Sequence, residues 1–150
     1  MITKFFCDVK MTAVDAFCQF YQKLDASSVT ALADVYANDV IFVDPVKQHQ
    51  GLPALTAYFA NLLENTENCV FDIKTVVTND SATFVTWVMH FQHPKLASNN
   101  AISVSGVTEL HIENDKVNYH RDYYDMGEMI YEHVPVLGGV VKWIKRRLVG

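Results

Sequence analysis

Three residues of this sequence are best suited to acid–base chemistry. Asp44 directly follows the apolar run 40–43 and directly precedes a proline. His120, Asp122 and Tyr124 recur at every second position, so on a β-strand they share one face. A carboxylate among apolar groups can take a proton from a bound molecule, and a histidine beside it can move a proton onward. The pattern therefore makes Asp44, His120 and Asp122 the candidate catalytic residues, with Tyr21 or Tyr124 as the hydroxyl donor to a substrate oxygen.

Each candidate also has a purely structural interpretation. An Asp-Pro pair commonly ends a strand and caps a turn, which is enough to explain Asp44. Arg121 and Asp122 are adjacent and are compatible with an ordinary ion pair on a sheet. His120 is compatible with a hydrogen-bonded histidine beneath a dimer contact. The residues alone leave both interpretations open.

The composition limits the class of protein. Half of the 150 residues are apolar, only 19% are charged, and the formal net charge is −5. Such a chain can bury a core of its own and is not disordered. Its charge gives it no overall attraction for nucleic acid. So much apolar material with so few charges indicates a large internal cavity or an oligomer interface.

Helical periodicity dominates the first part of the chain. Apolar residues recur at helical spacing over 12–24, where Thr12 and Asp15 have the spacing of a capping box. A second helix is predicted from Ser28 as N-cap through residue 36, and a third over 52–63. Between them we expect a short strand at 40–43 and a polar loop at 46–51.

The remainder changes to a period of two residues. Strands are predicted over 70–77, 82–93, 101–112 and 116–125, joined by turn residues. Residues 126–148 return to helical character, interrupted by Pro135 and by the glycine pair 138–139, with the last helix starting near residue 140. Helices followed by strands indicate an α+β fold, with helices on one face of a curved antiparallel sheet.

Two stretches resemble the nuclear transport factor 2-like fold, a cone-shaped α+β fold. Its members include ketosteroid isomerases, SnoaL-like polyketide cyclases and limonene-epoxide hydrolases. The first stretch is ADVYANDVIFVDPV at 33–46, with Gly51 and the helix after it. The second is GVTELHIENDKV at 106–117, with HRDYYD at 120–125. The resemblance implies one SnoaL-like domain over 1–150, with a core at 12–125 that encloses a pocket and a helical tail at 126–150.

The resemblance also implies roles for single positions. Asp44 matches the general base of ketosteroid isomerase-like sequences, and Asp122 matches a catalytic Asp of limonene-epoxide hydrolases. The isomerases hold the developing oxyanion with a Tyr and a carboxylic acid. Those two positions fall here on Phe20, which has Tyr21 beside it, and on Thr108.

The hydrolases pair their Asp with an Arg and a second Asp, and these positions fall here on Trp87 and Met89. Neither complete catalytic set is present. The resemblance therefore implies acid–base chemistry in a pocket rather than either of these reactions. The predicted substrate contacts are Phe20, Tyr21, Tyr58, Trp87, Met89, Thr108 and Tyr124.

The inward face of the last two strands depends on the length of one turn. A two-residue turn pairs Glu113 with Lys116, odd with even, whereas a three-residue turn pairs even positions with even ones. The resemblance favours even positions pointing inward. The odd positions Val117, Tyr119 and Tyr123 would then form an apolar outer face suited to a homodimer.

Two functions follow from these observations. The first is an isomerase, cyclase or hydratase that uses acid–base chemistry on a small hydrophobic oxygenated molecule. The second is a non-catalytic module of the same fold that holds a hydrophobic ligand or a protein. We expect no cofactor and no metal, because the histidines lack the spacing of metal ligands.

The two ends of the chain suggest its surroundings. Residues 1–10 have no long apolar segment typical of a signal peptide, and three cysteines without a paired motif favour a reduced, cytoplasmic protein. The tail has an apolar stripe beside Lys142, Lys145, Arg146 and Arg147. Such a helix can lie on an anionic membrane, although it more often docks on its own domain.

Overall fold

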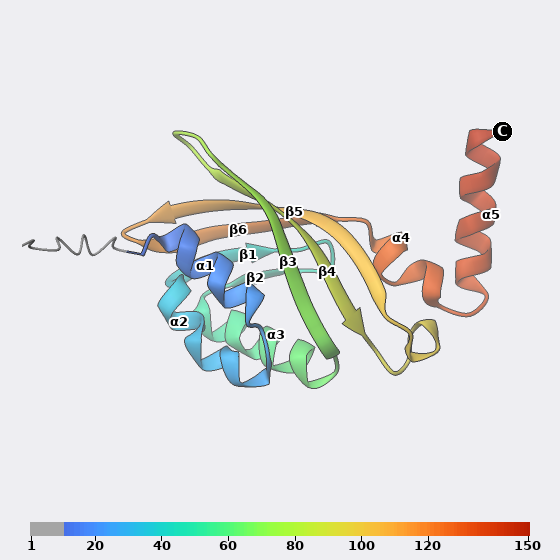
Figure 1. The fold of residues 1–150 in the computed structure, drawn as a ribbon, viewed down its shortest axis with the longest axis horizontal. Coiled ribbons are helices and arrows are strands. Elements are labelled where there is room, and N and C mark those ends of the chain that lie inside the picture. The colour runs from blue at the N-terminus through green and yellow to red at the C-terminus, as the bar shows by residue number, and fades with distance from the viewer. Residues whose placement is uncertain (1–10) are drawn as a thin grey trace, which may run out of the picture.

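The computed structural model describes residues 11–150, and these form one curved, unclosed sheet with helices across its concave side (Figure 1). The strand order is β2-β1-β6-β5-β4-β3. The strands are β1 (Tyr36–Val43), β2 (Gln48–Gln50), β3 (Glu67–Thr78), β4 (Thr83–Gln92), β5 (Ile102–Glu113) and β6 (Lys116–Tyr124). The α+β class is confirmed, whereas the predictions made on residues 1–10 lie outside the described part of the chain.

The sheet differs from the prediction at its β1–β2 side. β1 runs parallel to β6, with Phe42 opposite His120, so the sheet is mixed rather than wholly antiparallel. The physical reason is that these two strands are joined by most of the chain and not by a hairpin. Residues 46–51 were expected to be a loop, but Gln48–Gln50 pair with β1 because the turn after Asp44 folds the chain back.

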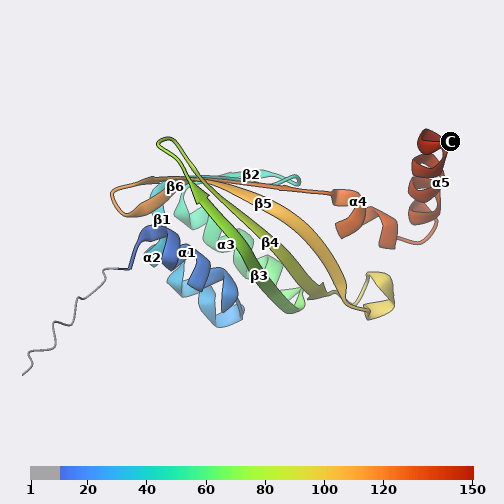
Figure 2. The ribbon, with the colours of Figure 1, turned by 45° about the horizontal axis from the view of Figure 1, so that its top comes forward.

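The helices α1 (Ala13–Gln22) and α3 (Leu52–Glu64) cover the concave face (Figures 1 and 2). The capping box between Thr12 and Asp15 is confirmed, with Asp15 N–H donating to Thr12 Oγ1 at 3.1 Å. Gly51 precedes α3 with a φ of +85°, a conformation that favours glycine.

The second helix begins earlier than predicted and has a different form. Asp25, not Ser28, is its N-cap, because the Asp25 carboxylate accepts the backbone N–H groups of Ser27 and Ser28. It is a 3₁₀ helix over Ala26–Ala31, followed by the short α2 (Leu32–Val35). Tyr36 therefore belongs to β1 and points into the core, where it is buried.

A β-bulge decides which face of β6 points inward. The turn has two residues, Asn114 and Asp115, both at positive φ, and it pairs Glu113 with Lys116. Asn118 is then an extra residue, since Ile112 pairs with Val117 but His111 pairs with Tyr119. Val117 and the even positions beyond the bulge thus share the concave face, and the expectation that even positions point inward is confirmed.

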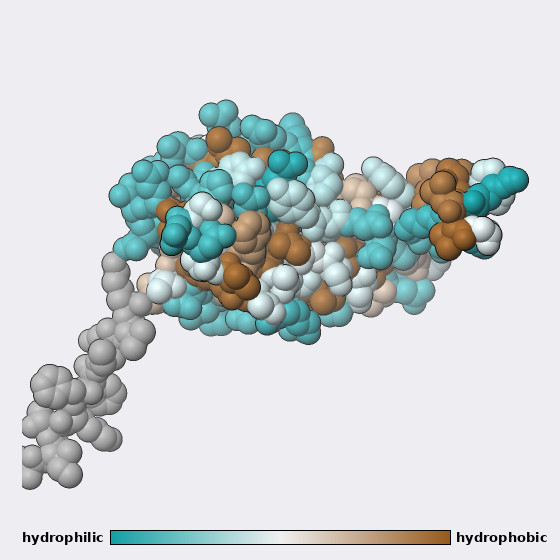
Figure 3. All heavy atoms as spheres, turned by 90° about the horizontal axis from the view of Figure 1, so that it is seen from above, coloured by the Kyte–Doolittle hydropathy of each residue, from teal (hydrophilic) through white to brown (hydrophobic). Residues whose placement is uncertain are grey.

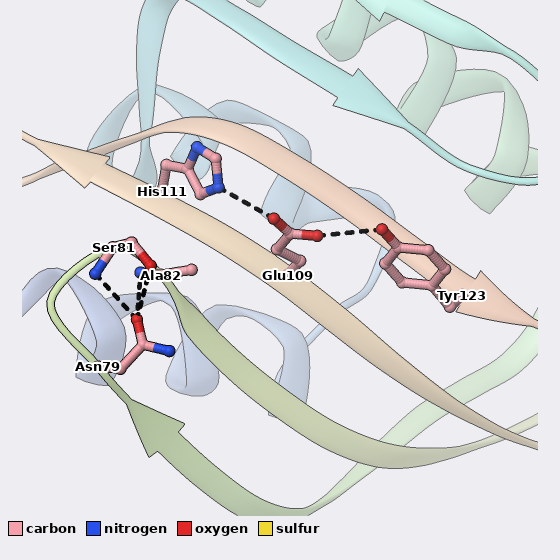
Figure 4. Close-up of polar contacts among 6 residues, drawn as sticks. All are labelled: Asn79, Ser81, Ala82, Glu109, His111 and Tyr123. Carbon is pink, nitrogen blue, oxygen red and sulfur yellow. Dashed lines mark hydrogen bonds and ion pairs between the residues drawn. The ribbon is translucent and has the colours of Figure 1, made fainter.

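The outer face of the sheet is more polar than expected. Val117 is completely buried on the inner side, so its predicted place on the outer face was wrong. Glu109 accepts hydrogen bonds from Tyr123 and from His111, and links β5 to β6 there (Figure 4). The homodimer through this face stays a prediction.

The β3–β4 hairpin turn is held by one side chain, because Asn79 Oδ1 accepts the backbone N–H groups of Ser81 and Ala82 (Figure 4). The tail contains α4 (Met126–Met129), a 3₁₀ turn at Tyr131–His133, and α5 (Leu137–Val149), which begins three residues before the predicted start. Among the described residues, no helix has the length and apolar character needed to cross a bilayer.

Gly106 of β5 lies directly against Trp87, because an added Cβ at this position would overlap the ring. Trp87 is buried and its indole N–H donates to Thr108, so the ring has little freedom to move. We predict that Gly106→Ala lowers the free energy of unfolding by about 1–3 kcal/mol, as measured by urea denaturation.

Gly139→Ala on α5 is the matched control, because a Cβ there meets nothing within 4 Å. It should leave the free energy of unfolding unchanged or raise it by up to ~1 kcal/mol. Equal destabilisation by the two substitutions would contradict this account of the packing.

Candidate functional site

The concave face encloses an inner cavity of about 60 Å³, bounded by α1, α3 and the sheet. Its wall is mostly apolar and aromatic, but two carboxylates and three tyrosines reach it. The lining residues are Tyr21, Leu24, Phe42, Asp44, Tyr58, Phe59, Leu62, Cys69, Phe71, Trp87, Met89, Asp122, Tyr124 and Met129.

A wider apolar vestibule of about 360 Å³ adjoins the inner cavity. The two spaces share Tyr58, Leu62, Cys69, Met89 and Met129 as lining residues. The vestibule continues over the end of α3 to the β4–β5 loop and α4, and its other lining residues are Asn61, Asn65, Thr66, Phe91, His93, Leu96 and Ile130. A molecule in both spaces would meet the carboxylates only at its inner end.

Asp44 lies in the wall of the inner cavity, and both of its oxygens are engaged. The side chain is 8% exposed. Oδ1 accepts the backbone N–H groups of Val46 at 2.7 Å and Lys47 at 2.8 Å, and Oδ2 accepts the Tyr58 hydroxyl. Asp44 therefore caps a turn and lines the cavity at once, which combines the two interpretations of the Asp-Pro pair.

Asp122 has a different environment on β6. Its Oδ1 accepts the Thr108 hydroxyl at 2.5 Å and lies 2.8 Å from His120 Nε2, at an angle too bent for a linear hydrogen bond. Trp87 donates its indole N–H to Thr108 Oγ1 at 2.8 Å. Because the indole can only donate, the Thr108 proton is directed to Asp122. Oδ2 has no hydrogen-bond partner among residues 11–150.

His120 lies behind Asp122 and has no exposed surface. Its Nδ1 is 2.8 Å from the Tyr36 hydroxyl, which is in turn 2.8 Å from the Tyr21 hydroxyl. Four rings surround the imidazole, with Phe42 nearest at 4.4 Å between centroids; the others are Phe17, Tyr21 and Tyr36. A buried network of polar contacts thus runs from Tyr21 through Tyr36 and His120 to Asp122, with hydrogen bonds at its first two steps.

The cavity keeps its tyrosines in the neutral form. Burial raises the pKa of Tyr58, and the hydrogen bond to Asp44 and the charge of Asp44 raise it further. Burial also raises the pKa of Tyr124, with additional contributions from the charges of Asp44 and Asp122. Tyr124 is close enough to both carboxylates to feel their charge, and its hydroxyl has no hydrogen-bond partner in the described part of the chain.

The structure brings most of the predicted site residues to the cavity. Asp44, Asp122, Tyr21, Tyr58, Trp87, Met89 and Tyr124 all line it. His120 and Thr108 stand behind its wall and contact Asp122 instead. Phe20 does not line the cavity, because it packs edge-on against Tyr21 and Phe59, whose rings do.

Comparison with known proteins agrees with this architecture. The family model of the SnoaL-like domain matches residues 17–120. The chain belongs to the SnoaL-like domain family. No curated protein sequence matches it.

Several solved structures share the fold of this SnoaL-like chain. A putative polyketide cyclase from Pseudomonas putida is 19% identical, with a TM-score of 0.69 over 83% of this chain and 98% of that one. A protein with a ketosteroid isomerase-like fold from Catenulispora acidiphila, in complex with trimethylamine, is 16% identical (TM-score 0.68, covering 82% and 93%). A nuclear transport factor 2-like protein of unknown function from Burkholderia pseudomallei is 11% identical (TM-score 0.70, covering 83% and 98%). At these identities the likeness shows the fold alone.

Sequence reasoning missed two residues of this SnoaL-like site. Tyr36 was expected to be the last residue of the second helix, but it lies on β1 and joins Tyr21 to His120. His49 stacks on the Tyr58 ring at 4.3 Å between centroids and helps to hold that hydroxyl on Asp44. Within residues 11–150 there is no group of three or more His, Cys, Asp or Glu side chains placed to hold a metal.

Removing the middle hydroxyl of the buried network should destabilise the protein. Tyr36→Phe leaves His120 Nδ1 buried without its partner, which we predict lowers the free energy of unfolding by about 1–3 kcal/mol. Tyr131→Phe is the control, because the same hydroxyl is removed from a residue that is 44% exposed. A loss of stability no larger than that of the control would show that the network is not needed by the fold.

Cys69 reports on the cavity because it lines both spaces. Burial raises the pKa of its thiol to about 11. Below that pH the thiol form dominates, so at pH 8 only about one molecule in a thousand carries the reactive thiolate. We predict that alkylation of Cys69 by iodoacetamide, followed by mass spectrometry, accelerates about tenfold per pH unit up to pH 10. Reaction at pH 8 at the rate of a free cysteine would contradict this prediction.

Proposed function

We propose that the chain is an acid–base enzyme that isomerises, cyclises or hydrates a small hydrophobic oxygenated molecule bound in the cavity. The observation that carries the proposal is the unequal bonding of the two cavity carboxylates. Both oxygens of Asp44 are hydrogen-bonded, whereas Oδ2 of Asp122 has no partner among residues 11–150 and lies in a largely apolar wall. A general base needs an oxygen that can reach the proton it removes. Asp122, rather than Asp44, is therefore the base in this proposal.

Tyr124 is the proposed hydrogen-bond donor to the substrate oxygen. Its raised pKa keeps the proton on the hydroxyl throughout the physiological range. A neutral donor in a dry cavity stabilises negative charge that develops on a carbonyl oxygen when an adjacent proton is removed. The cavity thus supports a base and an oxyanion donor, although Phe20 and Thr108 occupy the positions that supply donors in ketosteroid isomerases.

His120 acts as a positioning residue in this proposal, because it contacts Asp122 and not the cavity. A charged Asp122 favours the imidazole proton on Nε2, which leaves Nδ1 to accept the Tyr36 hydroxyl. Tyr36 then accepts the Tyr21 hydroxyl. The network orients Asp122 and joins it to Tyr21, a second cavity residue.

Asp44 acts through Tyr58. The two backbone donors fix the carboxylate, and the carboxylate fixes the Tyr58 hydroxyl at the junction of the inner cavity and the vestibule. This pair supplies the polar edge that a bound molecule meets beside Asp122. The proposal accordingly gives the two aspartates different tasks.

The second candidate function is a binding module without catalysis. It is favoured by the small volume of the inner cavity, about 60 Å³, and by the turn that immobilises Asp44. The two functions differ in one observable property. An enzyme whose base removes a proton next to a carbonyl group exchanges that proton with solvent, and a binding module does not.

We predict that the protein catalyses deuterium exchange next to the carbonyl group of at least one member of a panel of apolar cyclic ketones in D₂O, measured by NMR. Asp122→Asn should slow this exchange by about 100-fold or more, because the amide cannot accept the proton. Saturable binding of the ketones without exchange above background would favour the binding module instead.

Asp44→Asn is the matched control for that substitution. The amide oxygen can still accept the two backbone N–H groups, so the turn is retained, and we expect a loss of less than tenfold. A larger loss for Asp44→Asn than for Asp122→Asn would reverse the two assignments. Circular dichroism of both variants establishes that each is folded.

A further inference from the structure

The last helix, α5, is attached to the body by its polar side. Gly138 lies against the backbone of Glu132, with no room there for a side chain. Lys145 Nζ bonds to Glu132 and lies 3.6 Å from Asp125 Oδ2. Figures 1 and 2 show α5 standing beyond the end of the sheet, next to the segment that follows α4. This attachment is the reverse of the usual one, in which an amphipathic helix buries its apolar face.

The apolar side of α5 is exposed as a result. Leu137, Val140, Ile144 and Leu148 follow helical spacing, and Trp143 adjoins them. Val140 is 47% exposed, Trp143 is 53% exposed and Leu148 is 81% exposed. Figure 3 shows hydrophobic side chains gathered at this end of the molecule. Leu137 and Ile144 are 42% and 45% exposed, so every side chain of this face has a large part of its surface uncovered by the described residues.

The charges of α5 indicate what covers it. The helix has four cations, Lys142, Lys145, Arg146 and Arg147, and no carboxylate. A second copy of α5 on the same face would set cations against cations, with no acid on either helix to compensate. An anionic lipid surface offers hydrocarbon for the apolar side and phosphate for Lys142, Arg146 and Arg147, while Lys145 stays paired with Glu132. It is therefore the occupant that matches both properties.

The length and the tryptophan of α5 agree with this occupant. Thirteen residues span roughly 20 Å, too short to cross a bilayer of ~30 Å, so the helix would lie in the plane of the interface. The Arg147 guanidinium lies 5.1 Å from the centre of the Trp143 ring. An amphipathic ring beside a cation is suited to the headgroup region.

We propose that α5 is an interfacial helix that binds the protein to the surface of anionic lipid bilayers. This proposal stands independently of the proposed catalysis. It also has a consequence for the cavity, because Met129 at the end of α4 and Ile130 after it line the vestibule at the same end of the molecule. Membrane binding through α5 would bring the vestibule close to molecules dissolved in the bilayer.

The test is flotation of the full chain with two kinds of vesicle. One is pure phosphatidylcholine, and the other contains about 30% phosphatidylglycerol, which makes its surface strongly negative. We expect binding to the anionic vesicles, a decrease as salt rises, and little binding to the neutral ones. Trp143 emission should shift to shorter wavelength on binding, while buried Trp87 should not contribute to the shift.

Val140→Glu should reduce the bound-to-free ratio about tenfold or more, because it places a carboxylate on the apolar face. Val77→Glu is the matched control on the β3–β4 hairpin, where the same residue type is 57% exposed. It should bind as the unaltered chain does. Absence of binding to anionic vesicles, or equal losses in the two variants, would overturn the proposal. So would a dimer that binds no vesicles and becomes monomeric with Val140→Glu in sedimentation velocity.

Discussion

The fully buried imidazole of His120 is the constraint on which the rest of the site depends. A ring without exposed surface needs partners inside the protein, since an unpaired buried polar group is costly. Tyr36 meets this need at Nδ1 from the neighbouring strand β1, and Asp122 lies against Nε2 from two residues further along β6. The aromatic rings around the imidazole come from α1 and β1, so the helical layer, the parallel strand pair and the carboxylate are fixed relative to one another at this point. The position of Asp122 is thus set by the fold and not by a flexible loop.

The two aspartates of the cavity differ in their hydrogen bonding because they lie at different places in the sheet. Asp44 is at a strand end, where free backbone N–H groups and a helix tyrosine saturate it. Asp122 is inside a strand, where the backbone groups are used by the ladder and only side chains can reach it. Thr108 and His120 both approach Oδ1, because both lie on the sheet side of the carboxylate. Oδ2 is left on the cavity side. The asymmetry follows from the secondary structure on which each residue lies.

The sequence predicted the order of the long helices and strands, the capping box at Thr12 and the inward face of the even positions, but not the short strand β2. Hydrophobic periodicity and cap residues are local signals. The bulge at Asn118 could not be predicted from the sequence. A two-residue turn and an even-to-even register contradict each other unless one residue is extra, and no residue type marks where that residue lies. Tyr36 was misassigned for a related reason, since a tyrosine suits a helix face and a buried strand equally well. The side on which α5 docks depends on Gly138 and Lys145 meeting Glu132, a tertiary contact that helical periodicity does not contain.

The distribution of polarity along the cavity restricts how a ligand can enter. The carboxylates and hydroxyls line the inner cavity, whereas the vestibule outside it is almost entirely apolar. A molecule with one oxygen function would leave that function unsatisfied if its apolar end went in first, because the vestibule offers few groups to hydrogen-bond it. Entry with the oxygen function leading places a carbonyl next to Asp122 and Tyr124 and leaves the hydrocarbon part in the vestibule. The low charge content of the chain therefore bears on how a ligand enters. The apolar surface extends from the inner cavity through the vestibule to α4, and it favours a ligand whose oxygen function goes in first.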